Sequence, residues 1–191
     1  HLGVRRQRQM CIRDREESMS VRTGFIGIGA MGSPMALNIL KAGIPLVVHD
    51  VDENKTIEHE KAGAEVLYSP MEVANASDRT ICLVETTRQV EEVICGERGI
   101  IHGAKPGHIV ICMSTIDPTV AKRIASDLLL QEILMLDAPV SGGTARAKEA
   151  DLTVIAGGEK KVFDQCKDIF EAIGKDAFYI GDHGQGLVMK L

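Results

Sequence analysis

Three glycines in the chain have the spacing of a phosphate-binding turn, Gly27-Ile28-Gly29-Ala30-Met31-Gly32. This turn lies between an apolar pair, Phe25 and Ile26, and a helix-like run from Met35 to Leu40. In a G-x-G-x-x-G turn the first glycine permits the tight turn, the second lets backbone approach a pyrophosphate, and the third lets helix pack on strand. The helix N-terminus then offers free N–H groups to the anion. Because glycine turns are common, the prediction of dinucleotide binding depends on the rest of the chain.

A carboxylate follows the second predicted strand, Leu46 to His49, at Asp50. Dinucleotide-binding folds place an acid about 20 residues past the glycines, on the adenosine ribose hydroxyls. Asp50 could instead cap the next helix, and one residue could serve both purposes. Asp52 and Glu53 follow, with no arginine before Arg79, and these carboxylates would repel a 2′-phosphate. The sequence therefore favours NAD over NADP.

Two further predicted strands end in hydroxyl side chains. Ser114-Thr115 closes the apolar run Ile109 to Met113, where the hydroxyls could reach a cofactor or simply form a turn. The stretch Asp137 to Gly143 closes another strand, and its Ser141 precedes Gly142 and Gly143. A serine followed by two glycines can aim a hydroxyl and backbone N–H groups at a carboxylate, although Gly-Gly is also an ordinary loop.

The last stretch whose residues could take part in chemistry is Gly184-Gln185-Gly186-Leu187-Val188-Met189-Lys190. It has the character of a new helix that opens after the last strand, with glycines that allow close approach. Lys190 falls one helical turn beyond Gly186 on the same face. A lone lysine near a chain end is usually solvated, so local sequence alone gives Lys190 no role.

Strand-like and helix-like segments alternate along the chain, which predicts an α/β fold. We expect a doubly wound, Rossmann-type, largely parallel sheet with its ligands beyond the carboxyl ends of the strands. The glycine turn, Asp50, Ser114-Thr115 and Ser141 are all expected at such ends. Helix starts are signalled by Ser69-Pro70 and by Asp117-Pro118. The remaining expected elements are a helix ending before Gly43, a strand Arg79 to Val84, a helix Gln89 to Ile94, a strand Ile133 to Leu136, a strand Leu152 to Ala156, a helix Lys161 to Ile173 and a strand Ala177 to Ile180.

Composition limits the possible functions. The 191 residues are 45% hydrophobic, which supports one sizeable core, and no apolar run is long enough to span a membrane. A net charge of −5 and an aromatic content of 3% give no support for nucleic-acid binding. Five cysteines lack C-x-x-C spacing and six histidines are dispersed, so we predict no metal site. These features indicate a reducing, cytoplasmic setting.

Residues 1–18 do not have the pattern of the predicted fold. Five arginines crowd this segment without apolar periodicity. A basic targeting or nucleic-acid arm is one interpretation, and a non-native leader ahead of Met19 is the one we prefer. The expected organisation is thus a leader over 1–18, an NAD-binding domain over 19–182 and the start of an interdomain helix over 183–191.

Together these motifs resemble the β-hydroxyacid dehydrogenase family, which includes 3-hydroxyisobutyrate dehydrogenase and tartronate semialdehyde reductase. The resemblance runs from about Thr23 to Leu191 and rests on the four motifs in their order and spacing. It implies that the glycine turn, residues Gly27, Ile28, Gly29, Ala30, Met31 and Gly32, binds the nicotinamide dinucleotide together with Asp50, Val84 and Thr115. Thr115 would lie near the nicotinamide. Glu85 stands where the family commonly has proline, so the loop after Val84 is expected to differ.

The resemblance also implies a reaction. Ser141, Gly142 and Gly143 would hold the substrate carboxylate, and Lys190 would be the general acid/base. The expected activity is NAD-dependent hydride transfer between a small 3-hydroxy acid and its aldehyde or ketone. Alternatives are a relative of 6-phosphogluconate dehydrogenase, a relative of imine reductases, which typically lack this lysine, and a non-catalytic dinucleotide-binding module.

The chain departs from the family's pattern at its end. It stops one residue after Lys190, whereas the family places an asparagine four residues beyond this lysine and then a mostly helical second domain. That domain completes the site and forms the usual homo-oligomer interface. The resemblance therefore implies a fragment that binds NAD weakly and shows little turnover by itself.

Overall fold

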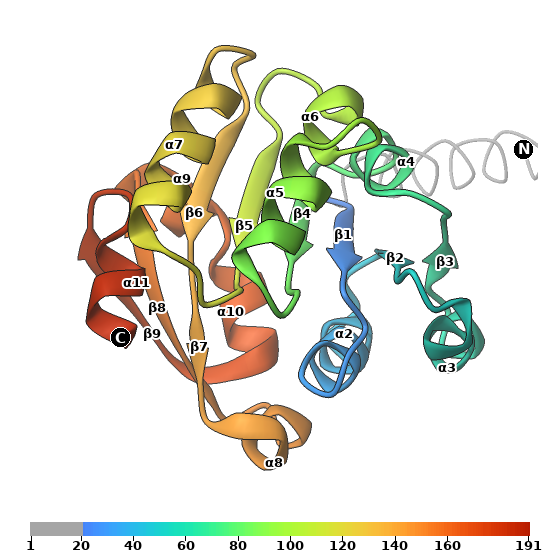
Figure 1. The fold of residues 1–191 in the computed structure, drawn as a ribbon. Helices are drawn as coiled ribbons and strands as arrows, with labels where there is room; N and C mark the ends of the chain where they lie inside the picture. The colour runs from blue at the N-terminus through green and yellow to red at the C-terminus, as the bar shows by residue number, and fades with distance from the viewer. Residues whose placement is uncertain (1–20) are drawn as a thin grey trace, which may run out of the picture.

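Residues 21–191 are described by the structure, a computed structural model, and form a sheet with helices on both faces (Figure 1). The leader predicted over 1–18 and the proposed start at Met19 lie outside the described residues. Within the described part the sheet has nine strands in the order β3-β2-β1-β4-β5-β6-β8-β7, and β9 pairs with β8. The predicted doubly wound α/β class is confirmed.

The first six strands are parallel and form the half of the sheet that carries the glycine turn. They are β1 (Thr23–Ile26), β2 (Leu46–His49), β3 (Glu65–Val66), β4 (Arg79–Cys82), β5 (Ile109–Cys112) and β6 (Leu134–Asp137). Neighbouring residues of one strand face opposite sides of the sheet, so Phe25 joins one buried cluster and Ile26 the other. Burial on both faces explains why these strands are continuous apolar runs in the sequence.

The remaining strands are β7 (Val140–Ser141), β8 (Leu152–Gly158) and β9 (Gly174–Gly181). Strand β8 is antiparallel to β6 and β7 and parallel to β9. Strand β6 is the parallel strand expected before the stretch Asp137 to Gly143. The short strand β7, which ends at Ser141 and runs antiparallel to β8, was not predicted. Strand β9 also begins at Gly174, earlier than the predicted Ala177.

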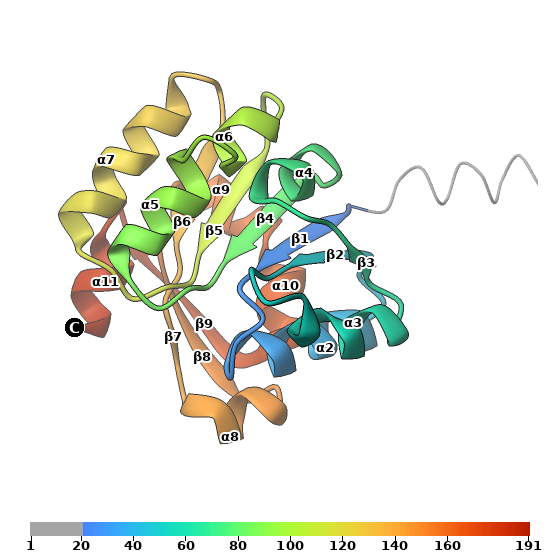
Figure 2. The same cartoon turned by 45° about the vertical axis from the view of Figure 1, so that its right-hand side comes forward.

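Two layers of helices cover the sheet (Figures 1 and 2). Helix α2 packs with α9 and α10 on one face, while α4, α5 and α7 contribute to the buried cluster on the other. The helices are α2 (Gly32–Lys41), η1 (Glu53–Thr56, 3₁₀), α3 (Ile57–Lys61), α4 (Pro70–Asn75), α5 (Thr87–Cys95), α6 (Ile100–Gly103), α7 (Pro118–Leu129), α8 (Gly143–Lys148), α9 (Lys160–Gln165), α10 (Lys167–Ile173) and α11 (Gln185–Lys190).

Helix ends follow the local sequence signals at several places. Gly43 has a φ of +81° just past α2, and the Ser69 hydroxyl accepts the Glu72 N–H at the start of α4. Asp117 caps α7 by accepting the Thr119 N–H at 2.7 Å. The predicted helix Lys161 to Ile173 is instead two helices with a break at Cys166.

The helix break at Cys166 lies beside a contact with Arg79 in the sheet. The Gln165 carbonyl leaves the helical pattern and accepts a 3.0 Å hydrogen bond from the buried guanidinium of Arg79 on β4. Arg79 also donates to the Asp168 carboxylate. A buried guanidinium needs several acceptors, and here it takes one from the helix. The interruption was not predictable because Arg79 lies far from it in sequence.

Candidate functional site

The glycine turn joins the end of β1 to the start of α2, and two of its glycines are required by the fold itself. Gly27 has a φ of +99°, and a Cβ at this position would lie 2.0 Å from the Leu83 carbonyl oxygen. A Cβ on Gly32 would lie 1.9 Å from the Gly27 carbonyl oxygen. A side chain at either position would collide with backbone, so these glycines let helix, turn and β4 pack closely.

Gly29 differs from the other two glycines of the turn. Its φ lies outside the left-handed region, and a Cβ built on it would meet no atom within 4 Å. The fold therefore has no need of glycine here, and the missing side chain leaves open space above the turn. Helix α2 has no side-chain cap and no acidic residue in its first turn, so its N-terminus suits an anion. This surface fits the pyrophosphate of a dinucleotide.

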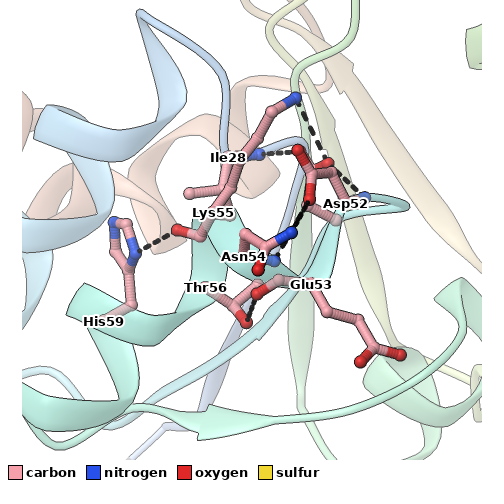
Figure 3. Close-up of polar contacts among 8 residues, drawn as sticks. Ile28, Asp52, Glu53, Asn54, Lys55, Thr56 and His59 are labelled. Carbon is pink, nitrogen blue, oxygen red and sulfur yellow. Dashed lines mark hydrogen bonds and ion pairs between the residues drawn. The ribbon is translucent and has the colours of Figure 1, made fainter.

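Asp50, the residue after β2, binds the glycine turn directly. Figure 3 shows Ile28, Asp52 and Lys55, which surround its carboxylate. Its carboxylate is buried, with 8% of the residue exposed, and Oδ2 accepts a 2.8 Å hydrogen bond from the Ile28 N–H. Oδ1 accepts from the Asp52 N–H at 2.9 Å and faces the Lys55 ammonium at 3.4 Å. The alternative that Asp50 caps the next helix is wrong, because Asp52 caps η1 by accepting the Asn54 N–H.

A cavity of about 240 Å³ lies beside Asp50, at the carboxyl ends of β1, β2 and β4. Its walls are largely apolar, which suits the flat base and the ribose of an adenosine. Val84 is part of the wall. The lining residues are Ile26, Gly27, His49, Asp50, Val51, Pro70, Val84, Gln89, Glu92, Val93 and Arg98.

Arg98 is a member of this wall that the sequence did not reveal. Its guanidinium donates to the Glu72 carboxylate at 2.9 Å, and its carbonyl accepts the Met71 N–H. The Tyr68 N–H, more than any other group, lowers the pKa of Glu72, although burial opposes it. Arg98 belongs to the loop between α5 and α6, where no motif marks it. Only the folded chain brings this cation to the cavity.

The two hydroxyls after β5 have different surroundings. Ser114 is buried, and its Oγ accepts the Val84 N–H at 2.8 Å, so it fastens the loop after β4 to the end of β5. Thr115 is exposed at the same end of the sheet. Of the predicted pair, Ser114 holds the loop in place and Thr115 is accessible to a ligand.

The Ser141-Gly142-Gly143 stretch connects β7 to α8, which projects from the end of the sheet (Figure 1). Gly142 has a φ of +139° and Gly143 a φ of +71°, conformations that favour glycine. A Cβ on Gly142 would also lie 3.0 Å from the Leu152 side chain, whereas one on Gly143 would meet nothing within 4 Å. Ser141 is half-buried beside these glycines.

Lys190 is the last residue of α11 and is half-buried. Among residues 21–191, the structure records no hydrogen bond or ion pair for its ammonium. Helix α11 contacts β6, β8 and α7. Since β6 lies next to β5, the helix that carries Lys190 is close to the sheet edge that bears Thr115. Ser141 lies on β7, which pairs with β8, a strand that α11 also contacts, and the glycine turn lies two strands away from β5.

Asp137 also lies in this region. It belongs to a motif identified in the sequence, but no function was predicted for it. It ends β6 and is 1% exposed, and burial raises the pKa of its carboxyl group above the ordinary value. Its Oδ1 accepts the Gly184 N–H at 2.7 Å and its Oδ2 accepts the Leu187 N–H at 3.2 Å. A carboxylate at the end of an apolar strand was the available signal, but its partners lie about 50 residues away.

Residues 21–191 contain no group of three or more His, Cys, Asp or Glu side chains placed to hold a metal ion. None of the helices in this range is both long enough and apolar enough to cross a membrane. The described cysteines are free, and Cys82 and Cys112 are buried neighbours on β4 and β5. Cys11 lies outside the described residues.

Residues 22–181 match the protein family described as the NAD binding domain of 6-phosphogluconate dehydrogenase. The mitochondrial 3-hydroxyisobutyrate dehydrogenase of Mus musculus is 39% identical over 176 residues, which cover 91% of this chain and 52% of that protein. The NAD-dependent L-serine dehydrogenase of Pseudomonas aeruginosa is 37% identical over 167 residues, covering 87% of this chain and 56% of that protein.

Solved structures agree with these matches. The crystal structure of 3-hydroxyisobutyrate dehydrogenase from Salmonella typhimurium superposes with a TM-score of 0.84 at 32% identity. The match covers 89% of this chain and 60% of that one. The chain spans about half the length of the curated relatives it matches.

Proposed function

The chain belongs to the family of the NAD binding domain of 6-phosphogluconate dehydrogenase, and from this premise we propose the activity of the whole protein. We propose an NAD-dependent dehydrogenase that interconverts a small 3-hydroxy acid and its aldehyde or ketone. The observation that carries the proposal is the open space at Gly29, above an uncapped helix N-terminus. The names of the relatives support the hydroxy acid as substrate class.

The cofactor side of the site involves residues from four strand ends. The turn from Gly27 to Gly32 would hold the pyrophosphate, and the cavity beside Asp50 and Val84 would take the adenosine. Thr115 would lie toward the nicotinamide. Asp50, Asp52 and Glu53 disfavour a 2′-phosphate, although the Lys55 ammonium beside Asp50 offsets part of that charge. NAD remains the expected cofactor.

The substrate side would use the serine–glycine stretch and the lysine. Bound NAD supplies the hydride acceptor for the carbon that bears the hydroxyl group. The Lys190 amine would take the hydroxyl proton during oxidation and return it, as the ammonium, during reduction. The Ser141 hydroxyl and the backbone N–H groups at Gly142 and Gly143 would hold the substrate carboxylate. Holding the carboxylate fixes which carbon faces the cofactor.

The alternatives are distinguished by the chemistry of Lys190 and of the substrate. An imine reductase relative and a non-catalytic module are disfavoured because both typically lack a lysine at this position. A 6-phosphogluconate dehydrogenase relative would need cations for the substrate phosphate, and we assign none within residues 21–191. The NADH-formation assay therefore includes 6-phosphogluconate among its substrates.

We also propose the wider setting of the protein. The division into 19–182 and 183–191, a homo-oligomer formed through a further domain, and weak turnover by the 191 residues alone follow from the family resemblance. A cytoplasmic location is our proposal, while the mouse relative is named as mitochondrial. Cell fractionation with an antibody to this protein would separate the two compartments.

The direct test of the activity is NADH formation by the longest polypeptide that the gene encodes. The panel comprises 3-hydroxyisobutyrate, L-serine, 2-(hydroxymethyl)glutarate and 6-phosphogluconate, each with NAD and with NADP. We expect oxidation of one of the first three acids with NAD. Turnover of 6-phosphogluconate alone would favour the alternative, and no NADH from any acid would refute the proposed function.

A further inference from the structure

We propose that Asp137 is a positioning residue for Lys190. Its buried carboxylate, on the last residue of β6, binds the N-terminus of α11 and so determines where the Lys190 ammonium is held. This inference rests on the proposed function of Lys190 as the acid/base.

The first support is the pair of hydrogen bonds between Asp137 and α11. One carboxylate oxygen accepts the N–H of Gly184, the N-cap residue, and the other accepts the N–H of Leu187. Those N–H groups have no partners within the helix, and a negative charge at this end is favourable. Gly184 has a φ of +85° and offers no side-chain cap of its own. The helix therefore takes its cap from the sheet.

The second support is the close packing of α11 on β8. A Cβ on Gly186 would lie 2.4 Å from the Ile155 carbonyl oxygen and 2.8 Å from the Asp137 carbonyl oxygen. A Cβ on Gly157, in β8, would lie 2.9 Å from the Gly186 nitrogen and 3.0 Å from Oδ1 of Asp137. The two facing glycines thus let α11 lie directly against β8, with the Asp137 carboxylate at its N-terminus.

The consequence concerns Lys190, which lies at the other end of the same short helix. A helix of six residues has few contacts of its own, so its direction depends on how its first turn is held. A small tilt at Gly184 would displace the Lys190 side chain, and proton transfer requires hydrogen-bond distance to the reacting oxygen. Loss of the Asp137 contacts should therefore reduce kcat more than cofactor binding.

The test compares Asp137→Asn with wild type. The amide keeps the shape but has only one acceptor oxygen, and its NH₂ group would face a backbone N–H. In the 191-residue chain we expect hydrogen exchange at Gly184 and Leu187 to become at least about tenfold faster, while the Kd for NADH changes less than about twofold. In the longest polypeptide we expect kcat on the panel acid to fall at least about tenfold with an unchanged KM for NAD.

The matched control is Asp168→Asn, which removes another carboxylate that accepts hydrogen bonds from the fold, in this case from Arg79. Asp168 pairs with the buried Arg79 at the opposite edge of the sheet, where β4 begins. We expect this variant to lower Tm while kcat and exchange in α11 stay at wild-type values. An equal loss of kcat in Asp168→Asn would overturn the inference, since general destabilisation would then explain both variants.

Two further variants keep the outcome decisive. Gly186→Ala disturbs the same packing of α11 on β8 from the helix side. It replaces Asp137→Asn if that variant does not fold, and we expect the same loss of kcat. Lys190→Met should abolish turnover with exchange in α11 unchanged, and turnover retained in this variant would refute the proposed function itself. If Lys190→Met is inactive while Asp137→Asn or its replacement keeps wild-type kcat, only the positioning inference fails.

Discussion

The Asp50 carboxylate and the Ile28 amide are joined by a 2.8 Å hydrogen bond across 22 residues of sequence. The acid at the end of β2 and the glycine turn at the end of β1 are therefore one structural unit. A ligand on the turn would meet a backbone whose geometry Asp50 has already determined. We therefore expect Asp50 to affect ligand binding through the shape of the turn, apart from any contact with a ribose.

Replacing Asp50 with alanine should weaken both the fold and NADH binding. The Ile28 N–H would lose its buried acceptor, which costs about 1–3 kcal/mol of stability. We expect the Kd for NADH, measured by fluorescence titration, to rise at least about tenfold. The control Asp52→Ala removes an exposed cap and should change that Kd less than about twofold. Equal NADH binding by wild type and Asp50→Ala would contradict this account of the turn.

Two glycine variants should separate the needs of the fold from those of the ligand. Gly32→Ala would place a Cβ against the Gly27 carbonyl oxygen, and we expect a loss of about 1–3 kcal/mol in the free energy of unfolding. Gly29→Ala meets no protein atom, so stability should change by less than about 0.5 kcal/mol. Its Kd for NADH should nevertheless rise at least about tenfold, because the methyl group occupies the ligand's space. Denaturant unfolding and NADH titration on both variants measure these effects, and unchanged NADH binding by Gly29→Ala would show that no ligand approaches there.

Much of the parallel half of the sheet was predictable from the sequence, because strands buried on both faces are apolar runs between clear helix signals. The strand that ends at His49 and the helix that Asp117 caps are examples. Strand β7 and the antiparallel direction of β8 were not predictable, since Val140-Ser141 has only two residues and strand direction depends on tertiary packing. The break at Cys166 depends on Arg79, which is distant in sequence.

The candidate site was predictable as motifs but not as contacts. The glycine turn and Asp50 were identified separately, yet their hydrogen bond appears only in the folded chain. Asp137 was quoted within a motif without a role, because its partners at Gly184 and Leu187 belong to a different motif. Arg98 carries no local signal at all. Long-range partners of buried polar groups are the information that a single sequence does not contain.

Ser141→Ala should affect substrate binding and leave cofactor binding unchanged. Loss of a hydrogen bond to a charged carboxylate costs about 1.5–3 kcal/mol, so KM for the hydroxy acid should rise by about tenfold or more. Steady-state kinetics with varied acid at saturating NAD gives this number. Thr144→Ala, which removes an exposed hydroxyl in α8, is the control and should leave KM unaltered. A wild-type KM in Ser141→Ala would remove Ser141 from the substrate site.

His108 should make the stability of the protein depend on pH. Burial lowers its pKa from 6.5 to about 4, and its Nε2 lies 2.9 Å from the Thr80 hydroxyl. The unfolded chain binds a proton more readily than the folded chain, so this stability is complete above pH 6.5 and is lost as pH falls toward 4. The loss should reach about 3 kcal/mol. His108→Gln should remove this part of the pH dependence of urea unfolding, whereas the exposed control His102→Gln should retain it.

The proposed dehydrogenase chemistry depends on Lys190 as the acid/base. Turnover by Lys190→Met in the longest encoded polypeptide, measured alongside NADH titration of the same protein, tests this role. We expect turnover to fall by at least about a thousandfold while the Kd for NADH stays within about twofold, with the surface variant Lys105→Met at wild-type rate. Turnover of Lys190→Met within about tenfold of wild type would contradict the claim.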